Sequence, residues 1–277
     1  MSTTGFRSAS DGLRLRTRHW DAAGRARSAV VVVHGLAEHT GRYEHVGEGL
    51  ASRGHDVRGT DLRGFGESEG ARAAIGSWDE YLDDLAGDVG TAAALGVPVV
   101  LLGHSLGGLI AVSYALGEHP RPDLLVLSAP AIDSTIPAIK KLMARLLGRL
   151  APAKSLDNGL RGNQLSHDPA VGERYFADPL VYTRTTLGMG RLALAAQVAV
   201  RKDLAHLDRP TLVIHGGADT IVPPQISAPL GALPTVDRVV FPAFRHETFN
   251  EEGGAAAVGT VADWIEANLR EGIAAGP

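Results

Sequence analysis

The chain has 277 residues, of which 44% are hydrophobic and 21% charged, and its formal net charge at pH 7 is −4. This composition suffices for a sizeable apolar core. Because the net charge is weakly negative, the chain lacks the excess of positive charge that nucleic-acid binding needs, and we expect no nucleic-acid partner. Because the sequence contains no cysteine, disulfides, thiolate metal sites and a cysteine nucleophile are excluded.

The first part of the chain predicts strands that alternate with helices. Residues 13–20 alternate apolar and polar side chains, which is typical of a half-exposed edge strand. The continuous β-branched run at 29–33 indicates a strand buried on both faces, as in a parallel sheet. A helix is expected at 43–53 and a short strand at 56–58.

The same alternation continues to residue 130. Apolar residues recur at helical spacing within 78–95. Apolar runs at 97–102 and 124–130 predict two further buried strands. Because strands and helices that alternate at this spacing form right-handed crossovers, we predict an α/β fold with a mostly parallel central sheet flanked by helices.

This pattern stops at 131–200, which we predict to be mostly helical or irregular, and it resumes with strands at 211–216 and 238–241. We therefore predict one domain, in which residues 1–130 and 201–277 form the α/β core and 131–200 form an inserted cap. The insertion follows a strand at the carboxyl edge of the sheet, where open α/β sheets bind ligands. We expect the cap to lie over the functional site.

Residues 103–107 have the sequence G-H-S-L-G, a G-x-S-x-G pattern between a predicted strand and a predicted helix. Gly103 and Gly107 form the nucleophile elbow, since they leave room for Ser105 to project its hydroxyl from a sharp turn. Ser105 is therefore the candidate nucleophile. The backbone N–H groups of Leu106 and of Leu36, which follows the strand at 29–33, are the candidate oxyanion donors.

A serine nucleophile needs a base, and the base needs an acid that fixes its tautomer. Asp219 follows a glycine-rich turn after the strand at 211–216, and His246 lies on the loop before the last helix. The order Ser105, Asp219, His246 is found in one large class of serine hydrolases. Taken alone, Asp219 also suits an Asx turn, and Asp133 is the alternative acid.

We expect neither a metal site nor a cofactor. The histidines and carboxylates lack a helical i, i+4 ligand pair, and the glycines at 103–108 lack the lysine of a phosphate loop. His39 and His104 are interpreted as supporting residues, and the turn at 61–68 as a buttress of the site.

With these residues in view, the chain resembles the α/β-hydrolase superfamily and, within it, the monoacylglycerol lipases and the lysophospholipase-like serine aminopeptidase S33 group. The segments that carry the resemblance are 34–43, 61–70, 103–108, 127–130, 166–169, 178–181, 219–223 and 246–251. Two residues depart from the family pattern: Phe65 stands where histidine is usual, and Leu106 where methionine is common. Both departures leave the preferred acyl length open.

The resemblance implies cofactor-free hydrolysis of a small-molecule lipid ester, a monoacylglycerol, through an acyl-enzyme on Ser105. A general carboxylesterase or a lysophospholipase would use the same three residues. An alternative of another class is a non-catalytic small-molecule-binding protein on the hydrolase scaffold. The sequence gives no indication of the oligomeric state.

Residues 136–150 of the predicted cap form an amphipathic helix with a basic opposite face. Such a helix lies at a lipid surface, or else its apolar face packs within the cap and its basic face is solvated. The candidate substrate-binding residues on this helix are Ile136, Leu142, Met143, Leu146 and Leu147. Because residues 1–11 are polar and no stretch approaches 18 apolar residues, we expect a cytoplasmic protein whose only membrane contact is peripheral and transient, through the cap.

Overall fold

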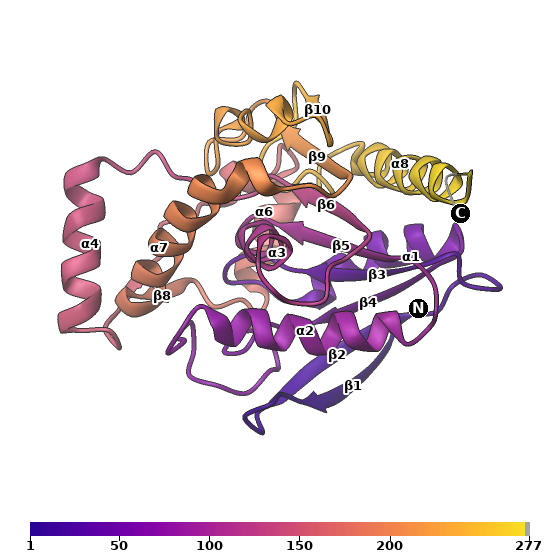
Figure 1. Ribbon diagram of the computed structural model, residues 1–277. Coiled ribbons are helices and arrows are strands. Elements are labelled where there is room, and N and C mark those ends of the chain that lie inside the picture. Colours follow the sequence, from indigo (N-terminus) through magenta and orange to yellow (C-terminus); the bar gives the residue numbers. More distant parts are fainter. Residues whose placement is uncertain (275–277) are drawn as a thin grey trace.

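A mixed, mostly parallel sheet forms the centre of the computed structural model, which describes the backbone of residues 1–274 and the side chains of residues 1–270. Within these residues the sheet has eight strands in the order β1-β2-β4-β3-β5-β6-β9-β10 (Figure 1). The strands are β1 (Thr3–Ser8), β2 (Arg14–Trp20), β3 (Ser28–Val33), β4 (His55–Thr60), β5 (Val99–His104), β6 (Leu124–Ser128), β9 (Thr211–Gly216) and β10 (Val236–Phe241). Neighbouring strands from β4 to β10 are parallel, whereas β1 and β2 are antiparallel. The predicted α/β class is confirmed.

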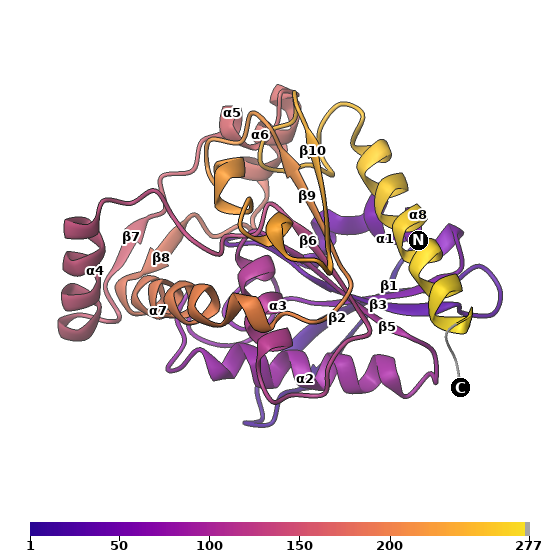
Figure 2. The same ribbon diagram turned by 45° about the horizontal axis from the view of Figure 1, so that its top comes forward.

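Helices cover both faces of this sheet. They are α1 (Glu44–Ser52), α2 (Asp79–Ala93), α3 (Leu106–Leu116) and α8 (Gly254–Ala274). Along β3, Val31 packs in one apolar cluster with residues of α2 and α3, and Val30 in a second cluster with residues of α1 and α8. Figure 2 shows α2 and α8 on opposite sides of the sheet. The run at 29–33 is apolar at every position because successive side chains enter different clusters.

The N-terminal edge of the sheet differs from the prediction. Residues 13–20 were expected at the edge, but β2 lies between β1 and β4, and the edge strand is β1. Most of β1 is polar and exposed, so it lacks an apolar signal. Backbone pairing with β2 positions it, and the Arg14 guanidinium lies 4.4 Å from the centre of the Phe6 ring. The prediction was wrong because pairing of this kind leaves no periodic pattern.

The segment between β6 and β9 contains the helices α4 (Ala138–Leu150), α5 (Gly162–Leu165), α6 (Pro169–Ala177) and α7 (Leu187–Asp203). It also contains β7 (Ser155–Asp157) and β8 (Arg184–Thr186), a separate antiparallel pair that the sequence did not predict because each strand has only three residues. Helix α7 packs against α3 of the core, and α4 packs against α7 (Figure 1). The segment contacts the core through α7 and also around α5 and α6, where Ser166 donates to Glu251 and Asp178 lies beside His39.

Short 3-10 helices complete the connections: η1 (Thr40–Tyr43), η2 (Leu204–His206), η3 (Pro224–Ile226) and η4 (Leu230–Ala232). Of the predicted core portion 201–277, the last three residues lie outside the described backbone. No helix among the described residues combines the length and the apolar character needed to cross a bilayer.

Candidate active site

Ser105 lies at the turn between β5 and α3 in a strained backbone conformation, with φ 52° and ψ −113°. A positive φ is uncommon for a residue with a side chain, and hydrogen bonds hold it: the Ser105 N–H donates to the Ser128 carbonyl at 2.9 Å. A Cβ on Gly103 would collide with the Gly107 carbonyl, and a Cβ on Gly107 with the Val33 carbonyl. Both glycines of the elbow are therefore required by close backbone packing.

The side chains of Asp219 and His246 form a direct, buried pair. His246 Nδ1 lies 2.7 Å from Asp219 Oδ2. Since an ionised carboxylate only accepts hydrogen bonds, Nδ1 carries the proton and Nε2 is left as an acceptor. The other oxygen, Asp219 Oδ1, accepts from the N–H groups of Ile221 and Val222 at 2.8 and 2.9 Å. Asp219 thus orients His246 and makes an Asx turn at the same time.

Hydrogen bonding keeps Asp219 ionised. Burial alone would raise the pKa of Asp219, but hydrogen bonds from His215 and His246 and from the Val222 backbone outweigh it and hold this pKa well below its usual value. His215, which the sequence did not single out, also contacts the Val222 carbonyl at 2.7 Å and Ser227 Oγ at 2.8 Å. It therefore braces the turn that presents Asp219.

The alternative acid, Asp133, is engaged elsewhere. Its Oδ1 lies 3.0 Å from Lys141 Nζ, and its other oxygen pairs with Arg201. The two partners belong to α4 and α7, so Asp133 links the segment between β6 and β9 to the end of β6. The structure brings His246 to Asp219, and it gives Asp133 cationic partners.

The two histidines interpreted as supporting residues make contacts of that kind. His104 Nδ1 lies 3.0 Å from Ser128 Oγ, and its ring packs against the ring of His246, with 4.8 Å between centroids. Burial lowers the pKa of His104 to about 3, so its ring is neutral at physiological pH. His39 Nε2 lies 2.9 Å from Asp178 Oδ2, which joins the loop after β3 to the end of α6.

The turn at 61–68 is a buttress, as predicted. Asp61 Oδ1 accepts from the N–H and the hydroxyl of Thr40, at 2.8 and 2.5 Å, and Asp61 Oδ2 accepts from the Glu67 N–H at 3.0 Å. These bonds tie the turn to the 3-10 helix η1. Phe65 of this turn is fully buried in the core.

The loop that carries Leu36 passes directly beside Ser105. A Cβ built on Gly35 would lie 3.4 Å from the Cβ of Ser105 and 2.8 Å from Glu38 Oε1. The Gly35 N–H donates to that same Glu38 oxygen at 2.6 Å, which fixes the loop. Gly35 therefore permits the close approach that an oxyanion donor at Leu36 needs.

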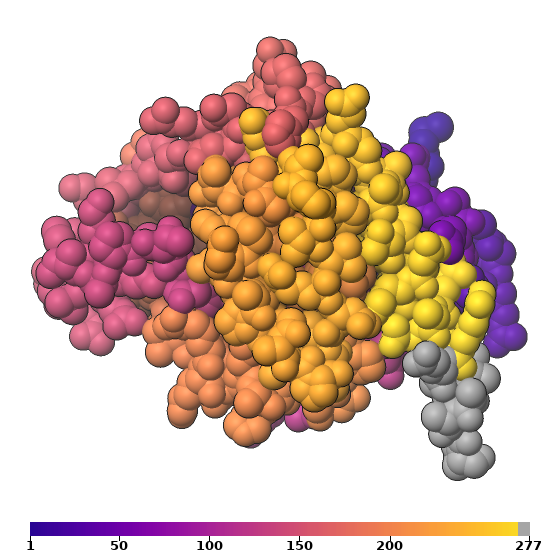
Figure 3. All heavy atoms as spheres, turned by 90° about the horizontal axis from the view of Figure 1, so that it is seen from above, coloured from indigo at the N-terminus to yellow at the C-terminus, as the bar shows by residue number. Residues whose placement is uncertain are grey.

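Two cavities meet at this point. The larger, about 300 Å³, is mainly apolar, and it is lined by Leu36, Leu106, Ser134, Ile136, Ala144, Leu156, Asp157, Thr185, Thr186, Leu187, Met189, Gly190, Ala193, Leu194 and Gln197. The smaller, about 60 Å³, is lined by Gly35, Leu36, Glu38, His104, Ser105, Leu160, Leu165, Tyr175, Ile221, His246 and Glu247. Leu36 borders both, so Ser105 and His246 lie in a small pocket of mixed polar and apolar lining, next to a larger and mainly apolar one. A hollow beside the chain around α4 is visible in Figure 3.

Of the five candidate substrate-binding residues on the predicted cap helix, Ile136 lines the larger cavity. The other four, Leu142, Met143, Leu146 and Leu147, are 45 to 53% exposed on α4 and are not among the residues that line it. Gly148 is the buried residue of this helix, and it lies close to Leu187 of α7. The apolar face of α4 is therefore only partly covered by packing within the cap.

Sequence reasoning missed a buried cluster of charged groups beside His246. Arg42 Nε donates to Glu38 Oε2 at 3.0 Å, and Arg42 Nη2 lies 2.8 and 2.6 Å from the two oxygens of Glu247. The Arg42 guanidinium also lies 4.7 Å from the centre of the Tyr175 ring, and the Tyr43 hydroxyl donates to Glu38 Oε1 at 2.6 Å. The i, i+4 spacing of Glu38 and Arg42, and the position of Glu247 next to His246, were the available signals.

The two carboxylates of this cluster differ in protonation. Burial disfavours the charge on Glu38, but the adjacent Arg42 guanidinium outweighs burial and lowers the pKa of Glu38 to about 2. Burial dominates at the second carboxylate and raises the pKa of Glu247 to about 7, and the nearby Glu38 charge adds to the effect.

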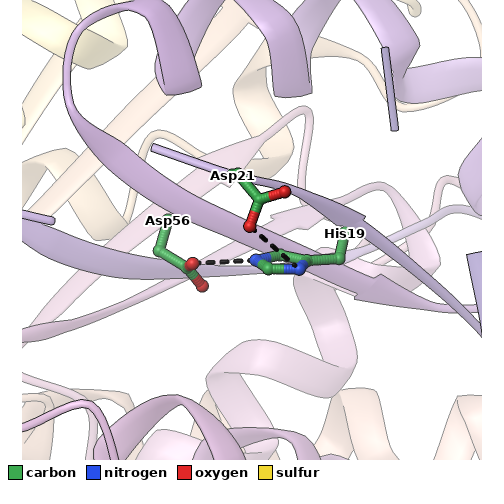
Figure 4. Close-up of side chains that lie close together, drawn as sticks. All are labelled: His19, Asp21 and Asp56. Atoms are coloured by element: carbon green, nitrogen blue, oxygen red, sulfur yellow. Dashed lines mark hydrogen bonds and ion pairs between the residues drawn. The ribbon is translucent and has the colours of Figure 1, made fainter. Parts of the chain in front are cut away.

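A group of His19, Asp21 and Asp56 brings three ligand-type atoms within 4.8 Å of one another (Figure 4). Asp56 Oδ2 lies 2.8 Å from His19 Nε2, and Asp21 Oδ1 lies 3.6 Å from His19 Nδ1. Arg58 donates to the remaining Asp56 oxygen at 2.6 Å. Each ring nitrogen of His19 faces a carboxylate, and Arg58 pairs with the Asp56 carboxylate as well. The group is therefore an ion-pair cluster. It lies at the start of β4, whereas Ser105 follows the end of β5. The cluster and Ser105 are therefore at opposite ends of the strands.

Comparisons with known proteins agree with this geometry. A family profile described as "Serine aminopeptidase, S33" matches residues 24–253. The monoacylglycerol lipase of Mycolicibacterium smegmatis is 33% identical over 271 residues, covering 93% of this chain and 95% of that protein. Phospholipase YtpA of Bacillus subtilis is 32% identical over 204 residues, covering 72% of this chain and 79% of that protein.

The fold is similar as well. The crystal structure of a monoacylglycerol lipase from Paleococcus ferrophilus superposes with a TM-score of 0.82 at 32% identity, covering 90% of this chain and 97% of that one. The profile extends over the elbow, the glycine-rich turn and the histidine loop described above. The chain therefore belongs to the serine aminopeptidase S33 family of α/β-hydrolases.

Proposed function

We propose that this protein is a serine hydrolase that cleaves monoacylglycerols to a free fatty acid and glycerol. One observation carries the proposal: Ser105 and the Asp219-oriented His246 line a small pocket that also contains the carboxyl groups of Glu38 and Glu247. This pocket shares Leu36 with a larger, mainly apolar cavity. An ester with an apolar acyl chain and a polar alcohol matches this division. The related monoacylglycerol lipases support the same substrate class.

The roles of the residues follow from the geometry. His246 Nε2 takes the proton of the Ser105 hydroxyl as the serine oxygen attacks the ester carbonyl carbon. Asp219 stabilises the imidazolium that results. The N–H groups of Leu36 and Leu106 stabilise the oxyanion of the tetrahedral intermediate. The bond between the carbonyl carbon and the alcohol oxygen then breaks, and His246 returns the proton to the departing alcohol.

The second half of the reaction uses the same groups. His246 accepts a proton from water, whose oxygen attacks the acyl carbon bound to Ser105. When the second tetrahedral intermediate collapses, the proton passes back to the serine oxygen and the fatty acid is released. The chain's own residues suffice for both halves, and no cofactor is needed.

The segment at 131–200 serves as the cap of this site. Leu160, Leu165 and Tyr175 line the pocket that contains Ser105, and Ile136 lines the apolar cavity. We propose that the acyl chain occupies the cavity between Leu106 and the cap.

The exposed apolar face of α4 suits contact with a lipid surface. Leu142, Met143, Leu146 and Leu147 are each about half exposed, and Lys140, Arg145 and Arg149 accompany them on the helix. Exposed apolar residues together with basic ones are typical of helices that lie in a membrane interface. We propose that α4 makes a transient, peripheral contact from which a single-chain lipid enters the apolar cavity.

The test is release of fatty acid from a long-chain monoacylglycerol, beside hydrolysis of a short nitrophenyl ester, by the wild type and by Ser105→Ala. We expect the wild type to hydrolyse both and the variant to hydrolyse neither. Hydrolysis of the short ester alone would contradict the monoacylglycerol assignment and leave an esterase. Hydrolysis of neither by the wild type would favour a binding protein on the hydrolase scaffold.

A further inference from the structure

The small pocket beside Ser105 contains two buried carboxyl groups that take no part in the proton transfers of ester cleavage. Glu38 is 4% exposed and Glu247 is 5% exposed, and both line the pocket together with Ser105 and His246. Among the lining residues that the structure describes there is neither a lysine nor an arginine. A leaving alcohol that enters this pocket would meet the oxygens of both carboxyl groups.

Among the residues that the structure describes, Arg42 is the cation that pairs with these carboxyl groups. Arg42 reaches Glu38 through Nε and both oxygens of Glu247 through Nη2, and its guanidinium is stacked on the Tyr175 ring. One positive charge therefore faces two carboxyl groups, and the net charge of the three is zero or −1, depending on the protonation of Glu247. His104, the other basic group lining the pocket besides His246, is neutral. No positive charge is left over for an anion.

The carboxyl groups still have room to accept hydrogen bonds from an alcohol. A carboxylate offers about four lone-pair sites. Glu247 accepts from Arg42 at two of them, and Glu38 accepts from the Gly35 N–H, the Tyr43 hydroxyl and Arg42. Hydroxyl groups can donate to the remaining sites. An ionised phosphate brings acceptor oxygens and negative charge instead of hydroxyl donors. It would lose its water shell in this pocket without gaining a hydrogen-bond donor.

We propose that Glu38 and Glu247 are specificity-determining residues, which make the leaving-group side of the site accept an uncharged polyhydroxy alcohol and exclude a phosphate. The inference rests on the proposed ester hydrolysis at Ser105, and it separates two substrate classes that share the chemistry, monoacylglycerols and lysophospholipids. A phosphate attached to the glycerol of a bound lysophospholipid would lie on the side of these two carboxyl groups. Like charges brought together at a binding site cost several kcal/mol, so we expect a preference of about 100-fold or more for the neutral alcohol.

The experiment compares kcat/KM for three oleoyl esters presented in micelles of one neutral detergent: monooleoylglycerol, lysophosphatidic acid with the same acyl chain, and methyl oleate. Methyl oleate lacks both the hydroxyls and the phosphate, so it reports the Ser105 chemistry and the folded fraction alone. Each rate is divided by the methyl oleate rate of the same variant. A merely structural defect then cancels, because it lowers all three rates together.

The variants are Glu247→Gln and Glu38→Gln, with Glu252→Gln as the matched control. Glu252 is an exposed residue on the same loop as Glu247 and does not line the pocket. We expect Glu247→Gln, assayed at pH 8 where a carboxyl group with a pKa of about 7 is mostly ionised, to lower the preference for monooleoylglycerol over lysophosphatidic acid by about 10-fold, because one buried negative charge is removed. Glu38→Gln should change the preference in the same direction, and the control should keep the wild-type preference.

The outcomes separate this inference from the proposed function. If the wild type cleaves both glycerol lipids equally well, or if both variants keep the wild-type preference, the inference fails while ester hydrolysis at Ser105 stands. If the wild type cleaves methyl oleate alone, the selection of a polyhydroxy alcohol is wrong. If it cleaves none of the three esters, the proposed function fails and the inference falls with it.

Discussion

The ring of His104 packs against the ring of His246 at 4.8 Å between centroids, and yet only His246 faces a carboxylate partner. His104 instead contacts Ser128 Oγ, which in turn lies 2.9 Å from Thr248 Oγ1. This chain of groups connects the end of β5 to β6 and to the loop that carries His246. A neutral His104 places no positive charge beside the His246 ring, which favours the proposed protonation of His246.

We expect the free energy of unfolding to decrease on acidification, over a pH range that the buried side chains of His104 and His55 determine. Burial lowers the pKa of His104 to about 3 and the pKa of His55 to about 4, both below the usual 6.5. Below pH 6.5 the unfolded chain therefore binds protons that the folded chain does not, so the free energy of unfolding decreases as the pH falls from 6.5 toward 4.

Urea unfolding at half-unit pH steps measures this slope. The limit for each histidine is about 1.4 kcal/mol per pH unit, the value for one proton. His55→Asn should flatten the slope between pH 6.5 and 4, whatever its effect on stability at pH 8. An unchanged slope would contradict the assignment of His55 to this window.

The two candidate acids should respond very differently to removal of their charge. Asp219→Asn keeps the shape of the side chain but no longer fixes the His246 tautomer, so kcat should fall by about 10⁴-fold. Asp133→Asn removes partly exposed ion pairs with Lys141 and Arg201, which contribute at most about 1 kcal/mol to stability. Initial rates on a short nitrophenyl ester compare the activities of the two variants, and Asp133→Asn should stay close to the wild type. A loss on Asp133→Asn comparable to that on Asp219→Asn would contradict the assignment of the acid.

Two helical glycines offer a matched test of the elbow. A Cβ at Gly107 of α3 meets the Val33 backbone, whereas a Cβ at Gly90, exposed on α2, meets nothing within 4 Å. Gly90→Ala should raise the free energy of unfolding by about 0.5–1 kcal/mol, because alanine is the better helix former. Gly107→Ala must displace β3 from α3 and should lower both the Tm and the esterase rate. Equal Tm values for the two variants would show that the elbow tolerates a side chain.

The apolar face of α4 should matter for substrate in a lipid phase and not for soluble substrate. The double variant Leu146→Ser with Leu147→Ser should lose activity on dispersed long-chain monoacylglycerol and retain it on a short soluble ester, because both side chains are half exposed. Leu95→Ser, at a 42% exposed leucine just after α2, is the control and should affect neither substrate. Equal losses on both substrates in the double variant would contradict the membrane role.

Much of the fold was predictable because parallel strands buried on both faces leave continuous apolar runs. The run at 29–33 and the run that ends at Leu102 correspond to β3 and β5. The edge strand β1 was not predictable, because a polar strand that depends on pairing with β2 carries no periodic signal of its own. The pair β7 and β8 was missed for a related reason, since three residues are too few to show a period.

The candidate active site was likewise predictable only in part. Ser105, Asp219 and His246 stand out in the sequence because each lies just after a strand and glycine residues mark two of the turns. The Arg42 cluster was missed because Glu38, Arg42 and Glu247 come from two loops about 200 positions apart in the chain, and only the fold shows that their charges are buried together. The surroundings of Leu142 and Leu146 depend on how α4 packs, which helical periodicity does not determine.

Helix α4 contacts the rest of the protein along one side, which includes Lys141, Ala144 and the buried Gly148, and most of its other side chains are exposed. A helix with so little buried apolar surface has a low free energy of local opening. Its amide hydrogens should exchange with solvent far faster than those of α3, which is buried along most of its length. Because Ala144 of α4 lines the larger cavity, we expect that part of the cavity wall to open independently of the turn that holds Ser105 and the loop that holds His246.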